Sequence, residues 1–111
     1  MAKEAVKIQE GGVIDYTAGG TLANGDVIPF AAGRIGVALD DAVSGDVISV
    51  AIEGVYEITA TTADAIAVGA TVYFDATARS VTTTSTDNTL AGMATTAKAG
   101  TTAGSIYVKI G

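Results

Sequence analysis

Apolar and polar residues alternate along much of this chain, and a period of two predicts β-strands rather than helices. The clearest alternation runs from 47 to 58, and shorter versions cover 34–40 and 106–110. In a strand over 47–58, one face would carry Ile48, Val50, Ile52, Tyr56 and Ile58, and the other Ser49, Glu53 and Glu57. Such strands place one face against a core and the other toward solvent or a partner.

Turn-forming residues interrupt this alternation about every 8 to 12 residues, a spacing typical of a β-sandwich or a small barrel. The signals are Gly11-Gly12, Gly19-Gly20, Asn24-Gly25-Asp26, Ala32-Gly33, Ser44-Gly45-Asp46 and Asp87-Asn88. We therefore expect an all-β fold, a small β-barrel or β-sandwich, with at most one short helical turn near residues 62–68. Thr62 or Asp64 would cap that turn and Gly69 would end it. Pro29, the sole proline, marks its strand as an edge or a chain crossing, because proline has no N–H to give to a sheet.

The two halves of the sequence resemble each other weakly. Each half has a Gly-initiated strand, then Gly-apolar-Ala, then a polar hairpin, and finally a strand that ends in glycine. The corresponding segments are 25–30 and 69–74, 36–38 and 92–94, and 47–54 and 105–111. We expect two similar half-sheets that close on each other as a small barrel.

The composition removes most of the side chains that enzymes use. The 111 residues include no Cys, His or Trp, which excludes disulfides, Cys/His zinc sites, a Cys nucleophile and a His general base. Acidic residues outnumber basic ones 12 to 6, and the net charge of −6 argues against binding to nucleic acid or to an anionic membrane surface. No phosphate-binding glycine loop and no nucleophile elbow occurs in the sequence. We predict a non-enzymatic protein without catalytic residues, cofactor or metal.

The carboxylates are the remaining candidates for chemistry. Glu53 and Glu57 would lie about 13 Å apart along one strand, whereas the two carboxylates of a glycosidase lie about 5 to 9 Å apart. Asp40, Asp41 and Asp46 flank a turn and could collect Ca²⁺, but their spacing does not match an EF-hand loop. We interpret the glutamates as solvated residues and the aspartates as turn residues that bond their own backbone.

Three other features are interpreted as structural. The Thr-rich segment 81–89 could form a low-complexity or O-glycosylated stalk, but Thr is also a good strand residue, so we favour an exposed strand over 81–84. The tyrosines are expected to be half-buried or to anchor an interface; they are Tyr16, Tyr56, Tyr73 and Tyr107. Four basic residues are isolated in the sequence and predict no basic patch; they are Arg34, Arg79, Lys98 and Lys109.

The beginning of the chain differs from the rest. It alternates charged and apolar residues, unlike a signal peptide, and the most apolar run, 65–74, is about half as long as a bilayer span. We expect an N-terminal arm over 1–10 and a single β domain over 11–111. Val6 and Ile8 would let the arm pair with a sheet edge of a neighbour; alternatively, the arm is an ordinary first strand of the same domain.

An ordered succession of segments resembles one protein family. A short arm is followed by a Gly-Asp-Val strand start, a Gly-Arg-Ile-Gly-Val-Ala-Leu strand, a second Gly-Asp-Val strand start, and a Gly-Ala-Thr-Val-Tyr-Phe-Asp strand. A Gly-Met-Ala segment and a terminal alternating strand complete the order. These segments belong to residues 25–27, 33–39, 45–47 continuing into 50–58, 65–75, 87–94 and 106–110. Over nearly the whole chain, this order is similar to the small capsid cement, or head decoration, proteins of tailed bacteriophages.

The resemblance implies a structural virion protein that is made in the host cytoplasm and located on the outer capsid surface. It further implies a trimeric β-barrel or β-tulip-like module that binds the major capsid protein of an icosahedral head and stabilises the shell. Capsid contact by the N-terminal arm would involve Ala2, Lys3, Glu4, Ala5, Val6, Lys7, Ile8 and Gln9. The alternative, a soluble carbohydrate- or ligand-binding β-module as in adhesins, draws on the Thr and Tyr content of the chain.

Overall fold

A computed structural model describes residues 11–30, 33–61, 65–100 and 104–111. Within these ranges the chain forms nine β-strands and no helix, which confirms the all-β prediction. The strands are β1 (Val13–Thr17), β2 (Val27–Phe30), β3 (Arg34–Ala38), β4 (Val47–Ala51), β5 (Gly54–Ala60), β6 (Thr71–Asp75), β7 (Ser80–Thr82), β8 (Thr89–Ala94) and β9 (Gly104–Ile110). No helix in the described residues is long and apolar enough to cross a membrane.

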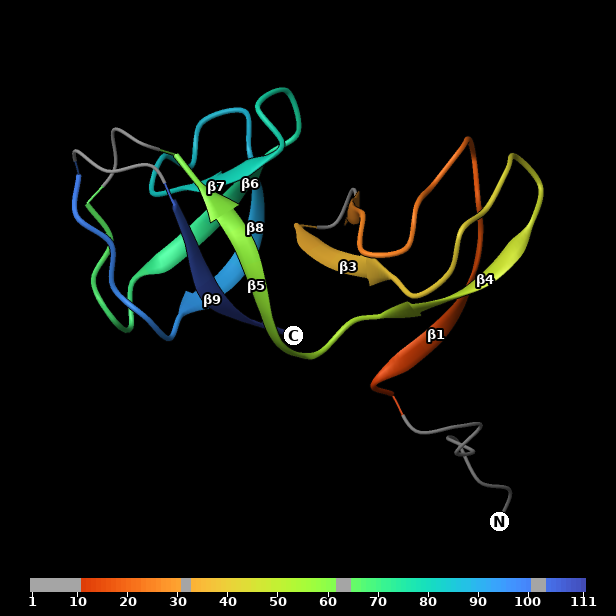
Figure 1. Cartoon of the computed structure of the whole chain (residues 1–111), viewed down its shortest axis with the longest axis horizontal. Coiled ribbons are helices and arrows are strands. Elements are labelled where there is room, and N and C mark those ends of the chain that lie inside the picture. Colours follow the sequence, from red (N-terminus) through yellow and green to blue (C-terminus); the bar gives the residue numbers. More distant parts are fainter. Residues whose placement is uncertain (1–10, 31–32, 62–64, 101–103) are drawn as a thin grey trace, which may run out of the picture.

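The first four strands form an antiparallel sheet in the order β1-β4-β3-β2. β1 pairs with β4 along its whole length, from Val13 opposite Ala51 to Thr17 opposite Val47. β2 pairs with β3 and lies at the edge of this sheet, so Pro29 occupies an edge strand as predicted. This sheet and the remaining strands lie side by side in Figure 1.

The other five strands close into a ring in the order β5-β7-β6-β8-β9. β5 and β9 form its longest ladder, from Gly54 opposite Ile110 to Ala60 opposite Gly104. The contact that closes the ring, between β5 and β7, is a single parallel pair, Ala60 with Val81. The predicted barrel is therefore realised as a ring-like sheet with one narrow closure, and only the second half of the chain forms it.

The segment 47–58 is two strands rather than the one expected. Ile52 and Glu53 separate β4 from β5, and Gly54 has a φ of 119°, which favours glycine. β4 pairs within the first sheet, whereas β5 pairs within the ring. Ile48 and Val50 of β4 are buried in the sheet cluster, and Ile58 and Ala60 of β5 are buried in the ring cluster. The alternation of apolar residues therefore continues across the break, although the two strands contribute to different cores.

The internal repeat is visible in the backbone hydrogen bonds. In the first half, Gly25 N donates to Ala38 O and Ala38 N donates to Asp26 O, at 2.7 and 2.9 Å. In the second half the corresponding bonds are Gly69 N to Ala94 O and Ala94 N to Ala70 O, at 2.8 and 2.9 Å. The predicted positions of the two halves thus share one pattern of backbone bonds, which also occurs within the first half between Ala18 and the residues Gly45 and Asp46. Each half builds its own sheet, so the two halves do not close on each other as one barrel.

Two expected local structures differ from the prediction. Residues 65–68, part of the expected helical turn, instead contain a β-bridge from Ile66 to Lys98, and residues 62–64 lie outside the described residues. The expected exposed strand over 81–84 is the three-residue β7, and all of its residues are buried. β7 is buried because it lies between β5 and β6 in the ring, where both of its edges are paired.

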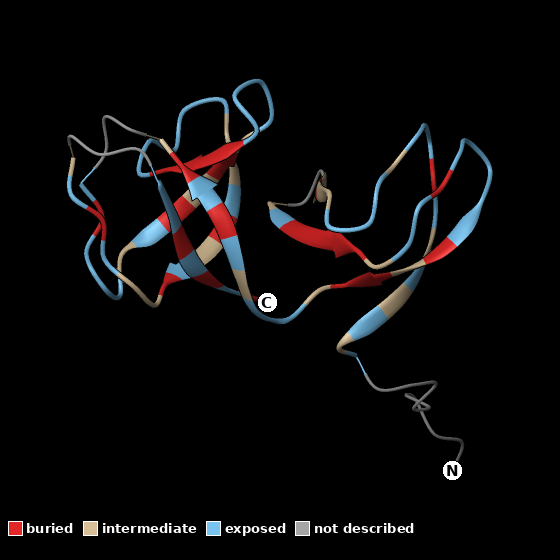
Figure 2. Cartoon of the chain, in the orientation of Figure 1, coloured by how far each residue is buried: buried red, intermediate tan, exposed pale blue. Residues whose placement is uncertain are grey.

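Two apolar clusters fill the fold, and β3 contributes to both. The larger cluster fills the ring around Val72, Phe74 and Ile106, and the smaller one lies on the first sheet around Val50 and Ile28. Along β3, Ile35 and Val37 join the ring cluster, while Ala38 joins the sheet cluster. Figure 2 shows β3 buried along most of its length between the ring and its own sheet. Burial of both faces of β3 joins the two sheets.

Candidate interaction surfaces

Several large apolar side chains remain exposed, although the chain has few bulky residues for its cores. They form two spatial groups and a few scattered positions; they are Val13, Val43, Val47, Val55, Val68, Leu90, Met93 and Tyr107. One group, Leu90 and Met93, lies on β8 of the ring, and the other, Val43 and Val47, lies beside the turn that precedes β4. Contiguous exposed apolar side chains often mark protein-interaction sites, whereas scattered ones are normal, so these two groups are the candidates for an interaction surface.

The β8 group lies in a groove of about 480 Å³ where the first sheet meets the ring. Leu90 and Met93, 42% and 43% exposed, provide its apolar wall. Between them the β6–β8 register shifts, so that Gly92 pairs with Val72 while Leu90 pairs with Tyr73. An added Cβ on Gly92 would overlap the Lys109 carbonyl oxygen, so glycine is needed where β9 passes β8 here.

The same groove is basic. Arg34, at the start of β3, and Lys109, on β9, both line it, and no acidic residue is among its described lining residues. The other two basic residues of the described ranges act within the chain: Arg79 bonds Val27 O, and Lys98 is buried with its Nζ 2.8 Å from Ala99 O. The sequence predicted no basic patch because Arg34 and Lys109 are brought together only by the packing of β3 beside the ring.

The second apolar group lies at the tip of the first sheet, which we define as residues 40–47. Val43 and Val47 are 60% and 66% exposed there, among three exposed aspartates. Asp46 Oδ2 accepts the Val43 N–H at 3.0 Å, and Asp41 Oδ1 accepts the Asn24 N–H at 2.8 Å. Asp46 therefore bonds the backbone of its own turn as expected, whereas Asp41 bonds the backbone of a different loop, at Asn24. The described residues contain no cluster of acidic side chains suited to a metal ion.

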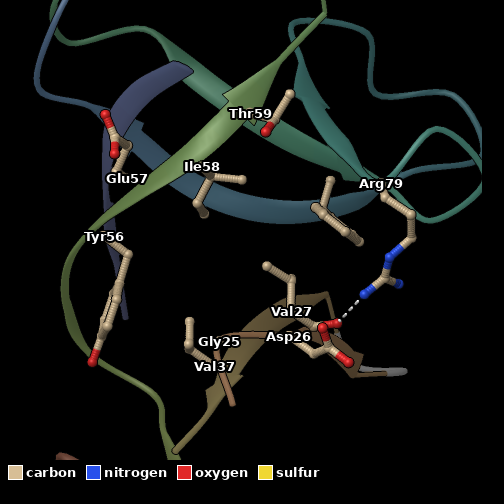
Figure 3. Close-up of a pocket in the computed structure, with 10 residues that line it drawn as sticks. Gly25, Asp26, Val27, Val37, Tyr56, Glu57, Ile58, Thr59 and Arg79 are labelled. Carbon is tan, nitrogen blue, oxygen red and sulfur yellow. Dashed lines mark hydrogen bonds between the residues drawn. The ribbon is translucent and has the colours of Figure 1, made fainter. Parts of the chain in front are cut away.

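A second cavity, of about 320 Å³, lies between the two sheets (Figure 3). Val27 and Val37 line it from the first sheet, and Tyr56 and Ile58 line it from β5. Arg79 reaches across it, and its Nη2 donates to the Val27 carbonyl oxygen at 2.8 Å. This cavity therefore lies at the interface between the two sheets.

Glu53 and Glu57 do not form a paired carboxylate site. Glu53 lies in the link between β4 and β5, while Glu57 lies on β5 and accepts a 2.9 Å hydrogen bond from the Ser105 hydroxyl of β9. Glu57 thus forms a cross-strand contact of an ordinary exposed sheet face.

The tyrosines follow the predicted range of exposure. Tyr16, Tyr56 and Tyr73 are partly buried, and Tyr107 is 49% exposed on β9. Tyr16 packs edge-to-face on Phe30, with ring centroids 5.8 Å apart, and so stabilises the first sheet. The predicted capsid-contact residues, Ala2 to Gln9, lie outside the described residues.

Comparison with known proteins gives one informative result. Neither the curated proteins nor the solved structures contain a significant match. A family model described as phage cement protein matches residues 8–110, which is most of the chain. The protein therefore belongs to the phage cement protein family, a structural, non-enzymatic family whose members bind the capsid of the virion.

Proposed function

We propose that this chain binds the outer surface of an icosahedral phage head as a homotrimer, contacts the major capsid protein, and stabilises the shell. The observation that carries this proposal is the family match over 8–110. It favours a capsid role over the carbohydrate- or ligand-binding module that the Thr and Tyr content left open.

The architecture suits this role. The described residues expose two apolar surfaces, the groove on β8 and the tip at 40–47. The groove is built on strands that are hydrogen-bonded into sheets, and the tip is a loop held by backbone bonds and by the Asp46–Val43 bond. Rigid surfaces lose little conformational entropy on binding. Weak contacts repeated over a shell add up through multivalency, so each copy needs only a modest affinity for the capsid.

We also propose that residues 11–111 act as one β domain and that 1–10 act as an arm against the capsid. Val6 and Ile8 supply apolar contacts in the arm, and Lys3 and Lys7 supply positive charge. An extended segment with this pattern can add to an exposed sheet edge of a partner.

The test mixes the purified protein with undecorated, expanded heads of its own phage. We expect it to co-sediment with the heads and to raise their resistance to heat and chelator. Absence of binding would contradict the proposal. Light scattering of the free protein and mass analysis of chemically cross-linked, decorated heads measure the trimer, and a monomer in both measurements would contradict that part.

The arm is tested by replacing residues 2–9 with a Gly/Ser segment of equal length, so that chain length is held constant. We expect weaker attachment to heads with an unchanged far-UV CD spectrum. Undiminished attachment would show that the arm does not contact the capsid.

A further inference from the structure

We propose that the tip of one copy, residues 40–47, binds in the β8 groove of the next copy, so that copies associate head to tail. This inference rests on the proposed homotrimer and names its two contact surfaces. The occupant of the groove is accordingly a second copy of this chain.

The charges of the groove and of the tip are complementary. Copies with a net charge of −6 repel one another unless their basic groups meet acidic groups at the interface. Arg34 and Lys109 are exposed basic residues, and both line the groove. The tip presents Asp40, Asp41 and Asp46, all exposed.

The tip and the groove both expose large apolar side chains. Val43 and Val47 on the tip are more exposed than any other described large apolar residues except Val68. The groove offers Leu90 and Met93, and the flexible thioether side chain of methionine adapts to a partner surface. The turn at 66–71 has a similar backbone and exposes Val68, but it contains no acidic residue, so only the tip combines both properties among these two turns.

The groove and the tip lie at opposite ends of β3. Arg34 opens β3 at the groove, while Asp40 follows the other end of β3, about 20 Å further along an extended chain. The loop after β3 extends away from the ring (Figure 1). One copy therefore does not fill its own groove with its own tip, and two different surfaces in contact generate a closed ring when the rotation between copies closes.

Because the chain has no cysteine, engineered thiols test this contact directly. The variant Val43→Cys/Met93→Cys is oxidised in solution and on heads, and we expect a covalent ladder that ends at trimers. Val68→Cys/Met93→Cys is the matched control, since Val68 is 66% exposed and Val43 is 60% exposed, and we expect no ladder from it.

A charge exchange gives a second, independent measurement. Asp40→Lys and Lys109→Glu should each weaken self-association about fivefold, and the double variant should recover most of the loss. The tip-in-groove contact would be overturned if the double charge variant shows no recovery and the Val43/Met93 pair gives no ladder. If mass analysis still shows trimers in that case, the homotrimer itself stands. Monomers in solution and on heads would overturn both. A ladder only when capsid protein is present, with capsid protein in the cross-linked product, would assign the groove to the capsid and overturn the inference.

Discussion

Arg79 Nη2 donates a 2.8 Å hydrogen bond to the carbonyl oxygen of Val27 and so links the ring to the first sheet. The same guanidinium lies over the Phe74 ring, with Cζ 4.9 Å from the centroid. The guanidinium thus combines a hydrogen bond to a carbonyl oxygen with a cation–π contact to an aromatic ring, two interactions that arginine makes well. The residue therefore helps to hold the two sheets in their observed arrangement, beside the burial of β3.

Arg79→Met should destabilise the protein by about 1 to 2 kcal/mol, because it removes a hydrogen bond from a charged donor and an exposed cation–π contact. Urea unfolding measures the difference. Arg79→Lys keeps the charge but loses the planar fork, so we expect an intermediate value. Equal stability of Arg79→Met and the parent protein would contradict a role for Arg79 between the sheets.

Gly36→Ala should cost about 1 to 3 kcal/mol through overpacking. An added Cβ at this position on β3 would lie 2.6 Å from Val50 Cγ1 and 3.0 Å from Phe30 Cε2. The matched control is Gly19→Ala, whose Cβ would meet nothing within 4 Å. Thermal unfolding should separate the two variants by several degrees, about 4–8 °C per kcal/mol for a domain of roughly this size. Similar melting temperatures would contradict the close packing of β3 on β4.

Asp46→Ala and Asp26→Ala should each cost about 0.5 to 1.5 kcal/mol and should have similar effects. Both carboxylates accept a hydrogen bond from the backbone N–H three residues earlier, Asp46 from Val43 at 3.0 Å and Asp26 from Ala23 at 2.9 Å. Asp15→Ala, an exposed acidic position on β1, serves as the control for loss of charge. If all three variants unfold at the same urea concentration, the turn bonds contribute nothing measurable.

Millimolar Ca²⁺ and EDTA should leave the melting temperature of the free protein unchanged. The Asp41 and Asp46 oxygens described above bond the backbone N–H groups of Asn24 and Val43, and the described residues hold no acidic cluster arranged for a cation. Differential scanning calorimetry in the two solutions provides the measurement. A Ca²⁺-dependent increase in the melting temperature would show that the aspartates of the tip bind the ion.

Sequence patterns could not predict which residues line the β8 groove. Arg34 and Lys109 appeared isolated, and no sequence pattern marked Leu90 and Met93 as parts of an exposed surface, yet all four line one groove. Their proximity depends on β3 packing beside the ring, on the bulge in the β6–β8 ladder, and on the close approach of β9 to Gly92 of β8. Short-range periodicity contains no information about either contact.

The sequence by itself determined that the chain forms strands, where most of them turn, and that Pro29 lies on an edge strand or at a chain crossing. Alternation and turn residues are local properties, because side chains point to opposite faces of a strand wherever it is placed. Tertiary structure alone decided that 47–58 divides at Gly54 between two sheets, and that only β5 to β9 close into a ring. An alternating pattern specifies which face of a strand is buried, but hydrogen bonding between distant strands decides against which core.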